Sequence, residues 1–395
     1  MKYANRAGFF MNSAVGYKSF VPAELPPNPP IQYDDELQGL LSLADRKLGR
    51  LDGVTQILPN PELFVAMYVK KEAVLSSQIE GTQASFVDVL STEYNQADDQ
   101  RHDDVKEVIN YVDAMNWGLE QLASFPLSLR LIRNIHARLI HNTRGANKNP
   151  GEFRTSQNWI GPAGCTLNTA TFVPPTVPDM NVALGDLELF IHQEDFIPAL
   201  VKIAMIHAQF ETIHPFLDGN GRMGRLLITF WLCQQNILTK PLLYLSFYFK
   251  KNRAEYYDRL MAVRKNGDWE NWIKFFLRGI AEVSDEATES ARAILKIKED
   301  ATNALYKKDG TNALYKKDGT NSNYQRLLNY LFEQPFIKRS DVEQYLDVSN
   351  PTAGSILEVF CQMNILVDCT PDKARNKMYA FGKYLDILNS GTELG

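Results

Sequence analysis

The sequence has few cysteines and no hydrophobic run long enough to cross a membrane. Its 395 residues include four cysteines, and no two of them form a Cys-x-x-Cys pair. This scarcity excludes a disulfide framework and a cysteine-based zinc site, and it favours a reducing compartment. No segment approaches the roughly 18 apolar residues of a membrane span, and the N-terminus lacks a basic stretch followed by an apolar run. We therefore expect a cytoplasmic protein with no membrane partner.

The sequence also lacks an excess of positive charge. The net charge is −5, from 42 Lys and Arg against 47 Asp and Glu. This balance gives no general electrostatic footprint for nucleic acid or an anionic membrane. A hydrophobic content of 45% and a charged content of 23% are typical of a globular protein. The length suggests two or three domains, with enough chain for a large core.

The polar chemistry of the chain is concentrated in one stretch, His214-Pro-Phe-Leu-Asp-Gly-Asn-Gly-Arg-Met-Gly-Arg225. The segments before and after it, 197–213 and 223–235, have the apolar spacing of helices. The stretch is therefore predicted to be a loop that ends one helix and opens the next. Unpaired N–H groups at a helix N-terminus suit an anion. Arg222 and Arg225, three residues apart, would share a helix face and could hold a phosphate chain.

Two common nucleotide-binding motifs do not fit this stretch. Gly219-x-Gly221-x-x-Gly224 has the letters of the dinucleotide fingerprint, but a predicted helix precedes it where that motif needs a strand. No Gly-Lys-Ser/Thr follows, so the stretch is not a P-loop. Asp218 is instead the natural ligand for Mg²⁺ beside substrate phosphates. His214 can act as a general base, whereas a lone histidine and aspartate would more often be a turn residue and a helix cap.

These twelve residues resemble, at every defining position, the HxFx(D/E)GNGRxxR signature of Fic-domain proteins. The resemblance covers about residues 35–282. It implies a mainly α fold, a Fic helical bundle with a β-hairpin flap over the active site. It also implies transfer of AMP from ATP to a Ser, Thr or Tyr hydroxyl of a protein. Residues 157–175 contain strand-type residues separated by Gly and Pro turn residues. This pattern predicts a β-hairpin, which fits the role of the flap.

The resemblance also implies roles for individual residues. His214 would take the proton of the attacking hydroxyl, Asp218 would hold Mg²⁺, and Phe216 would be a buried anchor. Backbone groups of the Gly-Asn-Gly turn would form an anion hole. Arg222 would hold the phosphates, and Arg225 would meet the γ-phosphate. The residues expected to bind ATP are Asp218, Gly219, Asn220, Gly221, Arg222, Met223, Gly224, Arg225, Tyr256 and Tyr257.

The resemblance also implies roles for a tyrosine pair, Tyr256 and Tyr257, and for the flap. The tyrosine pair would lie near the adenine, although a pair of this kind is more often part of a core. The flap residues would pair with the target protein as an added strand. They are Thr169, Ala170, Thr171 and Phe172.

A second informative stretch is Ser76-Ser-Gln-Ile-Glu80-Gly81. Glu80 ends a predicted helix, where the helix dipole disfavours a carboxylate by about 0.3–1 kcal/mol. A glutamate at a helix end is ordinarily a solvated side chain. Here Ser76, Glu80 and Gly81 resemble the (S/T)xxxE(G/N) inhibitory motif of one class of Fic proteins. That resemblance implies that Glu80 pairs with Arg225, denies it to the γ-phosphate and so inhibits the enzyme.

Four regions are expected along the chain. They are an N-terminal helical region with the inhibitory helix (1–110), a Fic catalytic core (111–282), a helix and linker (283–322) and a small C-terminal α+β unit (323–395). The linker contains the same nine residues twice, at 302–310 and 311–319. Two short copies are too few for a solenoid, so they are interpreted as a duplicated linker segment.

The order of elements expected in 323–395 resembles a winged helix-turn-helix. This region has seven Lys and Arg against nine Asp and Glu, and its candidate recognition helix, Pro351 to Met363, has neither Lys nor Arg. DNA binding depends on neutralising phosphates and reading bases with such residues. Protein interaction or homodimer formation is therefore favoured over DNA binding.

The function expected is a protein adenylyltransferase that uses ATP and Mg²⁺. Its protein substrate is not identified by the sequence, and the chain itself is one candidate. The intact Gly219-Asn220-Gly221 favours AMP over other transferred groups. Two alternatives remain. One is a hydrolase in which Glu80 orients water to remove AMP from a modified protein. The other is a winged-helix DNA-binding regulator whose Fic-like part senses nucleotide.

Overall fold

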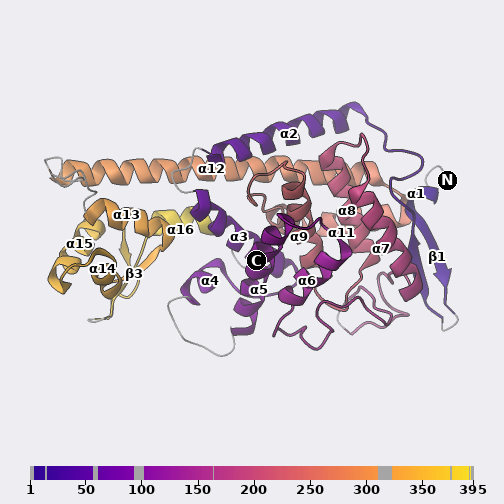
Figure 1. Ribbon diagram of the computed structural model, residues 1–395, viewed down its shortest axis with the longest axis horizontal. Helices are drawn as coiled ribbons and strands as arrows, with labels where there is room; N and C mark the ends of the chain where they lie inside the picture. The colour runs from indigo at the N-terminus through magenta and orange to yellow at the C-terminus, as the bar shows by residue number, and fades with distance from the viewer. Residues whose placement is uncertain are drawn as a thin grey trace. The chain divides into compact units, whose positions relative to one another are not determined.

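The computed structural model describes residues 4–13, 16–56, 61–92, 102–162, 164–309, 323–373, 376–390 and 392. These residues are mainly helical and form two small sheets (Figure 1). It divides into two compact units. The first comprises Met1–Gly53, Tyr68–Glu286 and Leu394–Gly395, and the second comprises Val54–Met67 and Ala287–Glu393. Nearly all of the predicted regions 1–110 and 111–282 lies in the first unit.

The centre of the first unit is formed by α8 (Ala199–Ile213) and α9 (Asn220–Gln234). Almost every side chain of α8 is buried, including polar ones such as His207 and Glu211, so the helix lies in the interior of the unit. Four further helices surround this pair (Figure 1), namely α5 (His102–Leu122), α6 (Leu129–Leu139), α7 (Val177–His192) and α11 (Arg253–Asn266). The loop between α8 and α9 is therefore held at both ends by buried helices.

Two long helices, α2 (Asp35–Gln56) and α12 (Trp269–Asp309), lie side by side along the first turns of α12 (Figure 1). Lys274 pairs with Asp34 and with Glu36, each at 2.7 Å, and Lys47 pairs with Asp285. The sequence suggested that a new, polar helix begins at Val283, but α12 is continuous. A change from apolar to polar surface does not end a helix, and no Pro or Gly occurs between 280 and 309.

Helix α3 (Pro61–Ile79) presents the predicted inhibitory stretch. Proline is favoured in the first helical position, where its missing N–H costs nothing. Gly81 follows the end of the helix with a φ of +99°, the left-handed conformation that glycine adopts without strain. The start and stop signals of this helix are therefore both local. Two short helices complete the unit, α4 (Phe86–Thr92) and α10 (Ser246–Lys251).

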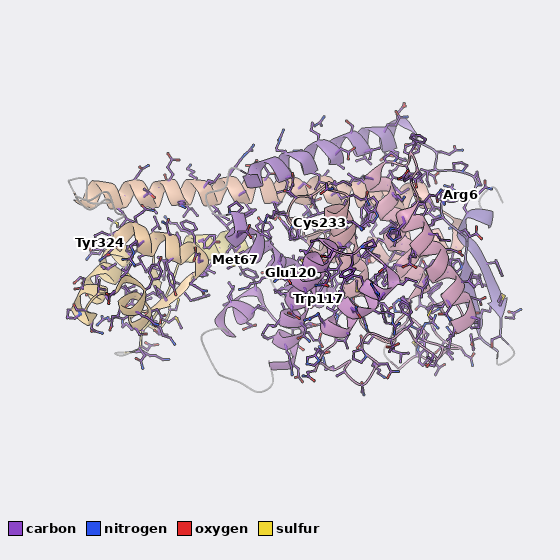
Figure 2. All side chains as sticks on the ribbon, viewed as in Figure 1. Arg6, Met67, Trp117, Glu120, Cys233 and Tyr324 are labelled. Carbon is purple, nitrogen blue, oxygen red and sulfur yellow. The ribbon has the colours of Figure 1, made fainter. Side chains whose placement is uncertain are left out.

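The N-terminal residues are more regular than the sequence indicated. After α1 (Ala4–Ala7), β1 (Gly8–Asn12) and β2 (Lys18–Pro22) form an antiparallel hairpin. Phe20 in β2 is buried, its N–H donates to Val173 O at 3.0 Å, and its ring lies 5.6 Å from that of Phe172. No local pattern in the sequence marks this hairpin, because it is stabilised by residues some 150 positions away. Arg6, labelled in Figure 2, pairs with Glu270 at 2.9 Å.

The second unit contains the end of α12 and a small α+β part. Its elements are α13 (Asn323–Glu333), β3 (Phe336–Lys338), α14 (Arg339–Leu346), α15 (Asn350–Gln362), β4 (Val367–Asp368), β5 (Met378–Ala380) and α16 (Gly382–Asn389). The three strands form an antiparallel sheet in the order β3-β5-β4. The sequence indicated neither β3 nor α16. The winged-helix assignment stays a prediction.

Two sequence features have a limited structural description. Residues 302–309 of the first repeat copy form the end of α12, and the rest of the repeat lies outside the described residues. Among the helices that the structure describes, none combines the length and the apolar content needed to cross a membrane.

Candidate active site

The loop between α8 and α9 is shaped by its own side chains. His214 leaves α8 in a left-handed conformation, with φ 50° and ψ 61°. The side chain of Asn220 closes the loop, because its Oδ1 accepts from Phe216 N and its Nδ2 donates to Phe216 O, both at 2.8 Å. Helix α9 begins at Asn220, three residues before the predicted start at Met223. The first N–H groups of α9 have no carbonyl within the helix to bond, so they are the natural anion donors.

A cavity of about 300 Å³ opens above this helix end. It is lined by Glu80, Gly81, Glu107, Arg144, His214, Leu217, Asp218, Gly219, Asn220, Gly221 and Arg222. The structure thus brings the two informative stretches of the sequence to one place. The lining has three carboxylates against two guanidiniums, so the wall carries an excess of one negative charge.

Glu80 and Arg225 form an ion pair beside this cavity. Arg225 Nη2 donates to Glu80 Oε1 at 2.6 Å, and Arg225 Nε donates to Ser76 Oγ at 2.8 Å. A Cβ added to Gly221 would overlap the Glu80 carboxylate, so this carboxylate lies directly against the first turn of α9. Glu80 therefore occupies an anion position at the helix N-terminus, where a phosphate would otherwise bind.

The charge of Arg225 keeps Glu80 ionised. Burial acts to raise the pKa of Glu80, but the attraction of Arg225 outweighs it and holds that pKa below its usual value. The two side chains differ in exposure, with 35% for Glu80 and 2% for Arg225. Glu80 is thus the partner that can leave, while Arg225 stays in place.

His214 is held by its backbone and leaves its imidazole free. Its carbonyl oxygen accepts from Arg154 Nε and from Asn158 Nδ2, each at 3.1 Å. Among the described residues, no group forms a hydrogen bond with the buried Nδ1 of His214. Burial, together with the charges of Arg264 and Arg154, lowers the pKa of His214 to about 3. The imidazole is therefore neutral near pH 7 and able to accept a proton.

His136 on α6 fixes the loop between α8 and α9 through a hydrogen bond to the Asp218 carbonyl. Gly151 N donates to His136 Nδ1 at 3.0 Å, so Nε2 carries the proton and donates to Asp218 O at 2.9 Å. The ring stacks on Phe216 with centroids 3.6 Å apart. Burial lowers the pKa of His136 to about 4, which keeps the ring in this neutral form. His136 was not among the predicted site residues, because no local pattern in the sequence marks it.

We expect His136→Phe to destabilise the protein. The ring can still stack on Phe216, but the Gly151 N–H and the Asp218 carbonyl lose their partner. Each buried group left unsatisfied costs about 1–3 kcal/mol. Denaturant unfolding should show this loss, while His141→Phe, a change at an exposed neighbour, should not. Equal stability of the two variants would show that His136 does not hold the loop.

Two more residues that were not predicted from the sequence line the cavity. Glu107 on α5 accepts from Arg222 Nη1 at 3.2 Å, from Arg144 Nε at 2.9 Å and from Thr82 Oγ1 at 3.0 Å. Arg144 follows α6 and also pairs with Asp104 at 2.9 Å. Arg222 is therefore held by a carboxylate from a different helix, in addition to its place in the motif.

Some predicted ATP-binding residues lie elsewhere. Tyr256 is buried, and its hydroxyl pairs with His207 Nε2 at 2.9 Å, so it has no free surface for an adenine. Tyr257 is 39% exposed and stays a candidate. Met223 is buried in the core. Gly224 faces α8, because an added Cβ would overlap Glu211. Met223 and Gly224 have these positions because the motif continues into α9, whose inner face belongs to the core. The role of these residues in ATP binding stays a prediction.

In the part of 157–175 that the structure describes, the predicted hairpin is reduced to a single antiparallel bridge between Ile160 and Phe172. Pro162, Pro174 and Pro175 lack the N–H groups that a longer ladder needs. Phe172 is buried under the Arg264 guanidinium, 4.3 Å from its ring centroid, so it anchors the segment. Thr169 and Thr171 are exposed and Ala170 is half-buried. Only these three remain available to pair with another chain.

The residues present fit a magnesium ion that is shared with a ligand. Among the described residues, no cluster of three or more His, Cys, Asp and Glu side chains could hold a metal alone. The carboxylate of Asp218 is 42% exposed towards the cavity, and Gly219 N donates to one of its oxygens, Oδ1, at 2.6 Å. Mg²⁺ is usually held by one or two carboxylates together with substrate phosphates and water.

Comparison with known proteins identifies two matching families. Residues 38–120 match the Fic/DOC family N-terminal region, and residues 126–232 match the Fic/DOC family. The Fic family protein from Desulfovibrio desulfuricans G20 has a similar fold, with a TM-score of 0.56 at 18% identity. The alignment covers 89% of this chain and 97% of that one.

Curated relatives are similar over part of their length. The protein adenylyltransferase Fic of Aedes aegypti is 31% identical over 165 residues, which are 41% of this chain and 29% of the relative. That of Drosophila willistoni is 26% identical over 261 residues, which are 63% of this chain and 48% of the relative. The chain thus spans less than half of the length of these two relatives.

Proposed function

The chain is a member of the Fic/DOC family, and we propose on this basis that it is a protein adenylyltransferase. The observation that carries the proposal is the shared cavity of His214, Asp218 and the N-terminus of α9. A neutral base, a carboxylate and an anion-binding helix end are the groups that transfer of a nucleotidyl group requires. Similarity to relatives named protein adenylyltransferase supports this choice of reaction.

In the proposed reaction, a Ser, Thr or Tyr hydroxyl oxygen of the target protein attacks the α-phosphorus of ATP. A new oxygen–phosphorus bond forms, the bond from the α-phosphorus to the bridging oxygen of the β-phosphate breaks, and pyrophosphate leaves. His214 accepts the hydroxyl proton. The N–H groups of Asn220 and Gly221 would stabilise the charge on the phosphoryl oxygens, which favours the transition state in a pre-organised site.

Asp218 would hold Mg²⁺, which supplies positive charge to the phosphates when bound. Arg222, fixed by Glu107, would bind the phosphate chain. Arg225 would meet the γ-phosphate, which orients the α-phosphorus towards the attacking hydroxyl. Positioning and charge stabilisation are expected to dominate such a transfer, since the protein itself forms no covalent bond.

The arrangement described here would be the inhibited one. Glu80 holds Arg225 and lies against α9, so it excludes the γ-phosphate by charge and by volume. Removal of its carboxylate would leave the cavity wall with no net charge, before any Mg²⁺ is bound. Inhibition therefore uses the same contacts that ATP would use, within one chain.

Mass spectrometry tests the proposal directly. The Glu80→Gly variant is incubated with ATP and host lysate, and proteins are searched for a mass increase of one AMP group on Ser, Thr or Tyr. The chain itself is one candidate target. The increase should be absent when His214→Ala is added to the same variant. Modification that persists in this double variant, or the addition of a different group, would overturn the proposal.

A second function is favoured by the position of Glu80. Its carboxylate lines the same cavity as His214, so it could orient a water molecule towards a phosphodiester. The wild-type chain would then remove AMP from a modified protein. Incubation of an AMP-modified target with wild type and no ATP should release AMP, and Glu80→Gly should release much less. Equal release by both proteins would exclude this role for Glu80.

For the C-terminal unit we propose a role in protein interaction, homodimer formation included. Helix α15 carries no Lys or Arg, so it lacks the side chains that most often contact DNA bases and phosphates. The same absence disfavours the DNA-binding regulator considered from the sequence.

A further inference from the structure

We propose that Arg144 is a further donor-binding residue, one that Glu107 holds beside Arg222 so that it meets the phosphate chain of ATP. This inference rests on the proposed function. The motif that identifies the site does not include Arg144 or Glu107. Both residues line the cavity, and they reach it from different elements of the first unit.

The backbone beside Arg144 is in contact with Asp218. A Cβ added to Gly145 would come within 2.5 Å of Asp218 Oδ2 and 2.9 Å of the Ile140 side chain. Only glycine allows this close approach. The loop after α6 therefore places Arg144 one residue from a backbone position that touches Asp218, and both side chains line the same cavity. A ligand phosphate bound near Asp218 would lie within reach of this guanidinium.

Glu107 is a fixed support, which distinguishes it from Glu80. The side chains of Glu107 and Arg222 are only 6% and 5% exposed, and their ion pair measures 3.2 Å. Removing one partner of a buried pair leaves an uncompensated charge, so such a pair does not open readily. Glu80 is 35% exposed and can withdraw. Glu107 thus acts as a positioning residue rather than as a second inhibitory carboxylate.

Arg144 is the exposed partner of Glu107. Its side chain is 58% exposed, so its ion pairs with Glu107 and Asp104 are partly solvated. Exposed pairs of this kind contribute little net stability and are exchanged easily. A phosphate offers Arg144 a fork of oxygens that suits bidentate hydrogen bonds. The guanidinium can therefore turn from Asp104 towards a ligand while Glu107 keeps it at the cavity.

The test measures nucleotide binding by isothermal titration calorimetry in the full chain with Glu80→Gly. Addition of Arg144→Ala should weaken ATP binding by about tenfold or more, as expected for loss of a charged hydrogen bond. AMP, which lacks the β- and γ-phosphates, should lose much less affinity. Arg144→Lys should restore part of the ATP affinity. The matched control is Arg138→Ala, a half-buried arginine paired with Asp113 at 3.1 Å outside the cavity lining, which should not change ATP affinity.

Two results would overturn the proposal. One is unchanged ATP affinity in Arg144→Ala, and the other is an equal loss of ATP and AMP affinity with no recovery in the lysine variant. Thermal unfolding of each variant separates a folding defect from a binding defect. Because the measurement is of binding, a chain that binds ATP through Arg144 but transfers no AMP would refute the proposed function and leave this inference standing.

Discussion

Glu80→Gly should increase transfer of AMP from labelled ATP to protein by about tenfold to a hundredfold. This factor corresponds to the loss of one hydrogen bond to a charged group, which contributes about 1.5–3 kcal/mol, because each 1.4 kcal/mol changes an equilibrium constant about tenfold. The substitution frees Arg225 for the γ-phosphate and clears the first turn of α9. Label incorporated into protein, the chain itself included, measures the effect.

The matched control for this result is Glu152→Gly. Glu152 is exposed and pairs with Arg133 outside the residues that line the cavity, so its loss removes a carboxylate without touching Arg225. Transfer by this variant should equal that of wild type. Equal transfer by the Glu80 and Glu152 variants would show that Glu80 is not inhibitory.

His214→Ala should abolish the transfer that Glu80→Gly releases. Loss of a general base reduces rates by about 10²–10⁴-fold. The protein should still fold, because the structure gives the buried Nδ1 of His214 no hydrogen-bond partner among the described residues, and its backbone contacts with Arg154 and Asn158 survive the change. Circular dichroism and thermal unfolding provide the check on folding. Unchanged transfer by the double variant would refute the role of His214 as the base.

The dependence on pH follows from the same residue. The pKa of His214 is lowered to about 3, so the imidazole is neutral and able to accept a proton at any pH well above that value. The charge of Glu80 acts to raise this pKa, so its removal lowers the pKa further. Transfer by Glu80→Gly should therefore not fall through protonation of His214 between pH 8 and pH 5.

The elements that the sequence predicted best are those whose signals are local. Helix α3 starts at a proline and is followed by a glycine, and α8 is marked by continuous apolar spacing. The contact between Glu80 and Arg225 spans 145 residues and could not be inferred from periodicity. It was predicted because each residue belongs to a recognisable motif. The structure places the two side chains in contact, while the inhibitory role remains our proposal.

Residues without a motif could not be predicted. His136 reaches the Asp218 carbonyl across 82 residues, and Glu107 reaches Arg222 across 115. A buried histidine and a glutamate in an amphipathic helix have no local pattern that distinguishes them from ordinary core and surface residues. Their roles depend on the packing of α5 and α6 against the motif loop, which only the fold reveals.

The N-terminal hairpin and the flap show the same limit for strands. Phe20 and Phe172 pack together although they lie far apart in the sequence, and each stabilises a short extended segment that would be weak alone. The strand-type residues at 159–173 predicted a regular hairpin at the flap. The prolines in and beside this segment limit it to one bridge in the described residues. Tyr256 shows the converse, since a residue in a suggestive pair proved to be part of the core.

The central claim is that Glu80 and the γ-phosphate compete for Arg225, and a double-mutant cycle on AMP transfer tests it most directly. Transfer from labelled ATP is measured for wild type, Glu80→Gly, Arg225→Gln and the double variant, with folding checked for each. We expect Glu80→Gly to raise transfer strongly in the background that keeps Arg225. In the Arg225→Gln background, the same substitution should have little effect. An equal increase in both backgrounds would contradict the claim, because Glu80 would then inhibit without acting on Arg225.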